Sequence, residues 1–151
     1  MGYGRGRGRG RGYGRGGRWG WESASGVQPL PQLPPPSPGV LRVVAAVDSN
    51  QGLESPISTR FARAPFLAIV DIVGGRVVNL NIIPNTYASG AQGVGVAIAQ
   101  WILTIRASVT IGPPLGPNAS MILQQAGVRI LPAQPGTPLR IALRTAGLAM
   151  V

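Results

Sequence analysis

Apolar residues fall along the chain in short blocks whose spacing predicts strands first and helices later. Residues 41–47 (LRVVAAV) and 66–72 (FLAIVDI) are almost continuously apolar, which is typical of strands buried on both faces. A polar loop, residues 48–65, separates the two blocks. We therefore predict two strands in the interior of a sheet.

A third block, residues 76–83 (RVVNLNII), follows a Gly-Gly turn signal and ends at a proline. Its residues alternate in polarity, so that Val78, Leu80 and Ile82 lie on the drier of its two faces. One wetter face and a terminal proline are typical of an edge strand. We predict a hairpin whose second strand forms an edge of the sheet.

The second half of the chain alternates helical and strand patterns. Apolar residues recur at helical spacing over 91–105, and a short apolar run follows at 108–111. A second helix is predicted from Pro117 to Gly127 and a last strand over 128–131. Thr137 begins a third helix that ends at Gly147. The order βββαβαβα predicts an α/β fold of the ribonuclease-H-like type, with a mixed five-stranded sheet and helices on both faces.

Charge and composition divide the chain into three segments. The net charge is +10, and all 14 basic residues are arginines, six of them within the first 18 residues. Residues 1–21 alternate glycine with arginine and form a low-complexity tail that we expect to be disordered. Residues 22–39 are proline-rich and are predicted to be a spacer, although Pro31 and Pro34 also have the P-x-x-P spacing of ligands for SH3-like grooves. Residues 40–151 form the predicted domain.

The residue types that are absent exclude most catalytic and metal chemistry. The sequence has no histidine, cysteine or lysine, so it lacks the usual general bases and soft metal ligands. Its domain contains three acids, Asp48, Glu54 and Asp71, too few for the carboxylate cage of a two-metal nuclease. The longest helical apolar stretch, Val94 to Ile105, is too short to span a bilayer. We predict a cytoplasmic protein that is not an enzyme and has no membrane partner.

Three segments resemble a known family. They are GLESPISTRFARAPFLAIVD (52–71), PNTYASGAQGVGVAIAQ (84–100) and IGPPLGPNASMILQQAGVRI (111–130). Over about residues 41–146 the chain resembles the dinitrogenase iron–molybdenum cofactor biosynthesis family, whose domain is called NifX-like. The resemblance implies a ribonuclease-H-like fold and a carrier of iron–molybdenum or other metal–sulfur clusters. Members that coordinate a cluster directly use His or Cys, which this chain lacks, so its cargo would be held as an anion.

A candidate anion pocket follows from the resemblance and from the loops that precede the first two helices. Glycines there permit close backbone approach, and the N–H groups of a helix start can bind an anion. The candidate residues are Arg60, Arg63, Asn85, Gly90, Gln92, Gly93, Gly112, Gly116 and Asn118. The alternative is structural: the glycines permit tight helix packing, Arg60 pairs with Asp48 or Glu54, and Phe61 fills the core. The sequence leaves both interpretations open.

The tail supports a second functional hypothesis. Arginines contact phosphates, aromatic rings stack on bases, and glycine keeps the backbone adaptable. The residues predicted to contact RNA or a ribonucleoprotein are Arg5, Arg7, Arg9, Arg11, Tyr13, Arg15, Arg18, Trp19 and Trp21. Two hypotheses therefore remain: a carrier of an iron/molybdenum–sulfur species that meets a cluster donor or acceptor protein, or an accessory protein that binds a polyanion. A tail that only raises solubility is the alternative to RNA contact, and the sequence leaves the oligomeric state open.

Overall fold

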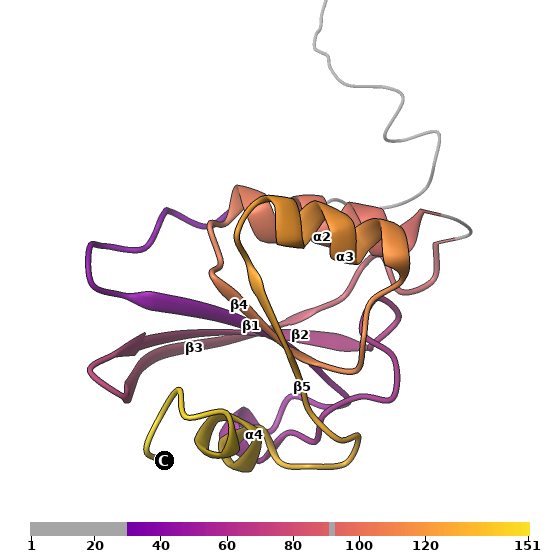
Figure 1. Ribbon diagram of the computed structural model, residues 1–151. Coiled ribbons are helices and arrows are strands. Elements are labelled where there is room, and N and C mark those ends of the chain that lie inside the picture. Colours follow the sequence, from indigo (N-terminus) through magenta and orange to yellow (C-terminus); the bar gives the residue numbers. More distant parts are fainter. Residues whose placement is uncertain (1–29, 91–92) are drawn as a thin grey trace, which may run out of the picture.

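The computed structural model describes residues 30–90 and 93–151, and a five-stranded mixed sheet forms its centre (Figure 1). The strands lie in the order β3-β2-β1-β4-β5. β1 pairs antiparallel with β2 and parallel with β4, β2 pairs antiparallel with β3, and β4 pairs parallel with β5. Their bounds are β1 Leu41–Val47, β2 Phe66–Val73, β3 Arg76–Pro84, β4 Val109–Gly112 and β5 Arg129–Pro132.

Helices cover both faces of the sheet. α2 (Val94–Thr104) and α3 (Pro117–Gln125) pack on one face, and α4 (Leu139–Thr145) lies on the other (Figure 1). A short 3₁₀ turn, η1 (Gly52–Glu54), lies in the loop after β1. The predicted order βββαβαβα, the five strands and the helices on both faces are confirmed. The predicted disorder of the Arg/Gly tail concerns residues outside the described ones.

Two apolar clusters, one on each side of the sheet, explain why the inner strands are so uniformly apolar. Val44 of β1 packs under α2 and α3 with Ile98 and Leu123. Val43, its neighbour in sequence, points to the opposite face and packs with Leu143 of α4. Since successive side chains of a strand alternate between faces, a strand covered on both sides needs apolar residues at nearly every position.

β3 is an edge strand, as predicted, but the first residue of its apolar face is Val77 and not Val78. The pairing of β2 with β3 shifts between Asp71 and Ile72, where Ile72 faces Val77 and Val78 is skipped. Val77 therefore packs on the α4 side of the core with Leu80, whereas Val78 is 59% exposed. The prediction that Val78 shares the face of Leu80 and Ile82 is wrong, because a bulge changes the alternation by one residue.

Part of the proline-rich segment lies against the domain. Leu30 is only 2% exposed within the α2 side of the core. The indole Nε1 of Trp101 donates a hydrogen bond of 2.8 Å to the carbonyl of Pro31, and a guanidinium nitrogen of Arg42 donates one of 2.8 Å to Pro34. Residues 30–34 are thus fastened to the folded body. The division into 1–21, 22–39 and 40–151 stays a prediction.

One buried hydroxyl makes no hydrogen bond within the described residues, and this predicts a stabilising substitution. Thr110 of β4 is 1% exposed, and its Oγ1 has no partner there. Thr110→Val keeps the shape and removes a desolvated polar atom, so the free energy of unfolding is expected to rise by about 1 kcal/mol. Urea unfolding with an unchanged m-value measures it. Thr104→Val is the control, since the Thr104 hydroxyl donates to the Trp101 carbonyl at 2.7 Å; a loss of stability in Thr110→Val would contradict the assignment.

Candidate functional site

The carboxyl edge of the sheet gathers the loops that lead into the helices. β1, β4 and β5 are parallel, and β3 runs the same way as β1 because β2 is antiparallel to both. These four strands therefore end at one edge, and α2, α3 and α4 begin there (Figure 1). In open α/β sheets this edge is where ligands usually bind.

Small residues let the loop after β1, the start of α2 and the start of α3 meet at this edge. A Cβ placed on Gly95 would lie 3.6 Å from the Cβ of Ala119 and 4.0 Å from the Cβ of Ala62. A Cβ on Gly112 would lie 3.0 Å from the ring of Phe61, and Gly112 has a φ of 151°. Phe61 is buried in the core. For Gly95, Gly112 and Phe61 the structure thus supports the packing interpretation.

Asn85 joins two of these loops. Its amide Nδ2 donates to the carbonyls of Ala62 at 2.8 Å and Ala64 at 2.9 Å. Its Oδ1 accepts from the backbone N–H of Tyr87 at 3.1 Å, and its own N–H donates to Pro65 at 2.9 Å. Only 6% of Asn85 is exposed. Its amide group fixes the backbone on both sides, and direct contact with a cargo stays a prediction.

Arg63 supports the loop before α2. Its Nη1 donates to the carbonyl of Ala88 at 2.9 Å and to that of Gly90 at 2.8 Å. Gly90 sits in a tight place, since a Cβ there would lie 3.0 Å from Cγ2 of Val94 and 3.2 Å from the carbonyl oxygen of Tyr87. Arg63 is nevertheless exposed. It can face an anion only while it also holds this loop.

Arg60 differs from Arg63. Its side chain is exposed and makes no hydrogen bond or ion pair with any described residue. The suggested pairing of Arg60 with Glu54 is wrong, because Glu54 binds Arg140 at 2.9 Å. That hydrogen bond and the charge of Glu54 raise the pKa of Arg140. No ion pair with Asp48 is present among the described residues either. Arg60 therefore offers an uncommitted guanidinium at the carboxyl edge.

The starts of α2 and α3 add backbone donors at the same edge. The N-cap residues are Gly93, with φ 71°, and Gly116, and neither helix has a side-chain cap. Uncapped first-turn N–H groups are open to an anion or to water. Pro117 at the start of α3 has no N–H, and Asn118 after it is exposed. Gln92 lies outside the described residues. The predicted site residues that are described thus surround one edge of the sheet.

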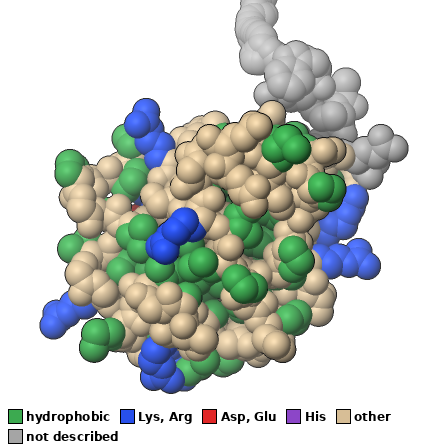
Figure 2. All heavy atoms as spheres, viewed as in Figure 1, with side chains coloured by type: hydrophobic (Ala, Val, Ile, Leu, Met, Phe, Trp, Pro, Cys, Tyr) green, Lys and Arg blue, Asp and Glu red, His purple; other side chains and the backbone are tan. Residues whose placement is uncertain are grey.

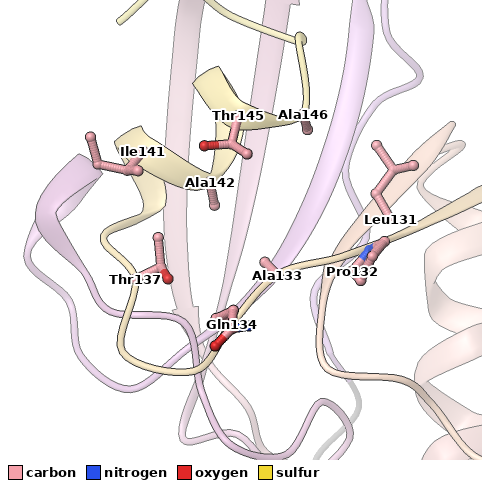
Figure 3. A pocket seen from close by; sticks show the side chains of 9 residues that line it. All are labelled: Leu131, Pro132, Ala133, Gln134, Thr137, Ile141, Ala142, Thr145 and Ala146. Carbon is pink, nitrogen blue, oxygen red and sulfur yellow. The ribbon is translucent and has the colours of Figure 1, made fainter.

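Sequence reasoning missed an apolar hollow of about 520 Å³ between α4 and the end of β5 (Figure 3). A second hollow of about 540 Å³ lies beside it, and both border the segment 132–134. The proline-rich run PAQPGTP, which begins at the last residue of β5, was the available signal. None of the predicted pocket residues lines either hollow. The first hollow is lined by Leu131, Pro132, Ala133, Gln134, Thr137, Ile141, Ala142, Thr145 and Ala146.

The donor set at the carboxyl edge suits an anion. Within the described residues no group of three or more His, Cys, Asp or Glu side chains could hold a metal ion. The available donors are backbone N–H groups and guanidinium, which bind oxyanions or sulfide-bearing anions and not bare cations.

In the part of the chain that the structure describes, no helix combines the length and the apolar character needed to cross a bilayer.

The fold defines a small α/β protein of ribonuclease-H-like order, and its carboxyl edge presents backbone N–H groups and an exposed guanidinium. Residues 41–147 match the family described as "Dinitrogenase iron-molybdenum cofactor", and the chain belongs to this family. The resemblance found in the sequence is thereby confirmed.

One related sequence and two solved structures are similar to this chain. An uncharacterized protein of Methanocaldococcus jannaschii is 29% identical over 94 residues, which cover 62% of this chain and 75% of that protein. The apo orange protein of Desulfovibrio gigas superposes with a TM-score of 0.62 at 24% identity, over 73% of this chain and 91% of the other. A Thermotoga protein described provisionally as a NifB protein superposes with a TM-score of 0.58 at 29% identity, over 71% of this chain and 87% of the other.

Proposed function

We propose that this protein is a non-enzymatic carrier that holds an anionic iron/molybdenum–sulfur species at the carboxyl edge of its sheet. The observation that carries the proposal is the unpaired guanidinium of Arg60, in the loop whose Ala62 lies near Gly95 of α2, at the edge where α2 and α3 start without a side-chain cap. Membership in the iron–molybdenum cofactor family supports the kind of cargo. A cytoplasmic location and a cluster donor or acceptor protein as partner are part of the same proposal.

The chemistry of holding is electrostatic. The cargo keeps its own sulfide ligands, and the chain supplies hydrogen-bond donors and positive charge. Arg60 contacts the cargo, and the N–H groups of α2 and α3 complete the site. Arg63 and Asn85 act through the loops whose carbonyls they bind, and are positioning residues. Because no metal–protein bond has to break, release to an acceptor is simple dissociation.

Arg60→Gln is the direct test of the carrier proposal. Tetrathiomolybdate serves as the probe, and its dissociation constant is measured by absorbance titration of the full chain. Loss of one charged hydrogen-bond donor is expected to weaken binding about tenfold, while the melting temperature stays unchanged because the side chain has no partner in the described residues.

Arg144→Gln is the matched control, since it removes the same charge from the exposed side of α4. Equal weakening in both variants would reduce the effect to net charge and contradict a site at Arg60. A wild-type chain that ignores tetrathiomolybdate and carries no iron or molybdenum after purification from its own host would contradict the carrier proposal as a whole.

A second candidate function is contact of the tail with RNA or a ribonucleoprotein. The observation that favours it is the composition of residues 1–21, where six arginines alternate with glycines among tyrosine and tryptophan. Such a segment binds single strands through phosphates and stacked bases with a strong dependence on salt. These residues lie outside the described ones.

A further inference from the structure

The three described α-helices end in the same backbone motif with different residues. After each helix one residue has a positive φ: Arg106 at 59° after α2, Gly127 at 83° after α3 and Gly147 at 74° after α4. At the C-terminus of α2, the N–H of Arg106 donates to the carbonyl of Leu103, and the N–H of Ala107 donates to the carbonyl of Ile102. The same pair of bonds closes α3 and α4. This is the Schellman motif, whose left-handed position favours glycine.

Arg106 therefore occupies a position that strains any residue with a Cβ. In the described part of the chain, Arg106 is the only residue other than glycine that has a positive φ. Its side chain is exposed and has no hydrogen bond or ion pair there. The one structural reason for an arginine here is that a cation is favourable at the C-terminus of a helix. Strain that no contact offsets points to a function for the side chain.

Two more unpaired arginines lie on the same edge of the sheet. Ser108, two residues after Arg106, accepts a hydrogen bond from the N–H of Arg129 at the start of β5. Arg76 begins β3 at the hairpin, which lies at this edge because β2 is antiparallel to β1. All three are exposed and have no partner in the described residues. Figure 2 shows arginine side chains projecting from several sides of the body.

No acidic side chain of the described part of the chain offsets this charge. Asp48 follows β1, and Glu54 binds Arg140 next to the start of α4, so both belong to the carboxyl edge. Asp71 is 8% exposed and is neutralised by the buried Arg42. The amino edge of the sheet is therefore positive, with four strand spacings of about 4.8 Å between Arg76 and Arg129.

We propose that Arg106 and Arg129, with Arg76 farther along the edge, contact the phosphates of single-stranded RNA. RNA is favoured over an acidic protein by the composition of the same chain, whose residues 1–21 carry six arginines among tyrosine and tryptophan. Such a segment suits phosphates and bases. This surface lies opposite the cargo edge and does not depend on the carrier proposal.

The test compares Arg106→Gln/Arg129→Gln with Arg60→Gln/Arg140→Gln, which removes the same formal charge at the carboxyl edge. Binding of a labelled oligouridylate of about 12 nucleotides to the full chain is followed by anisotropy as salt is raised. The first variant is expected to weaken binding several-fold and to reduce the slope of log K against log salt by about 1.4, because each phosphate contact contributes about 0.7. The control is expected to keep the wild-type slope.

Equal losses in both double variants, or a wild-type chain that does not bind the oligonucleotide, would overturn the proposal. Binding of oligoglutamate and not of RNA through the same arginines would also overturn it. A chain with glutamine at all six tail arginines separates the tail from the edge: a further loss on Arg106→Gln/Arg129→Gln in this background supports the edge. RNA binding that depends on the tail alone would overturn the edge and leave the tail hypothesis standing.

Arg106→Gly examines the structural alternative. If Arg106 serves the RNA contact, glycine relieves the strain and the melting temperature rises by about 3 °C, while RNA binding weakens. A lower melting temperature with unchanged RNA binding would show that the arginine serves the helix end, and would overturn its assignment to RNA.

Discussion

Arg42→Met is expected to lower the free energy of unfolding by about 3–5 kcal/mol, because it leaves a carboxylate buried without its partner. Arg42 is 5% exposed, and its guanidinium binds both oxygens of Asp71 at 2.9 and 3.2 Å. It also donates to the carbonyls of Pro34 and Ile105, each at 2.8 Å. One side chain thus joins β1, β2, the proline-rich segment and the end of α2. Urea unfolding measures the loss.

The double variant Arg42→Met/Asp71→Leu is the control. Replacing both charges with apolar side chains of similar size removes the unpaired carboxylate, so most of the stability is expected to return. The carbonyls of Pro34 and Ile105 lose their donor in both variants, and any remaining deficit is assigned to them. A loss below about 1 kcal/mol in Arg42→Met, or no recovery in the double variant, would contradict this account of the pair.

Asn85→Asp is expected to cost about 3 kcal/mol or more, although it changes a single atom type. The new carboxylate would lose the two donors that now bind the carbonyls of Ala62 and Ala64, and would place negative charge against those oxygens. Asn85 is 6% exposed, so water cannot replace the lost donors. The loop that carries Arg60 would lose its anchor, and tetrathiomolybdate binding is expected to fall together with stability.

Asn81→Asp is the matched control, since it makes the same chemical change on the exposed face of the edge strand β3. It is expected to leave both stability and binding close to wild type. If Asn81→Asp and Asn85→Asp cost the same, the effect comes from net charge and not from the hydrogen bonds that link the two loops. Urea unfolding and the absorbance titration provide the two measurements.

Particular residues show how far the candidate site could be predicted. The convergence at the carboxyl edge was predictable, because the strand order of an α/β sheet fixes where its loops meet. The separate roles of Arg60 and Arg63 were not. Both are arginines in one loop, yet Arg63 reaches carbonyls 25 and 27 residues away, whereas Arg60 has no partner in the described residues. The two arginines differ because the loop before α2, which supplies the carbonyls, lies within reach of Arg63.

The sequence by itself determined the order of the elements, the burial of β1 and β2, the excess of positive charge and the absence of soft metal ligands. These follow from local patterns and from composition, which need no knowledge of distant neighbours. The tertiary structure decided that Arg42 neutralises Asp71 29 residues away, that a bulge exposes Val78, and that Arg140 takes Glu54, 86 residues away, as its partner. Hydrogen bonds and ion pairs extend over a few ångströms, so their partners are chosen only once packing has brought distant segments together.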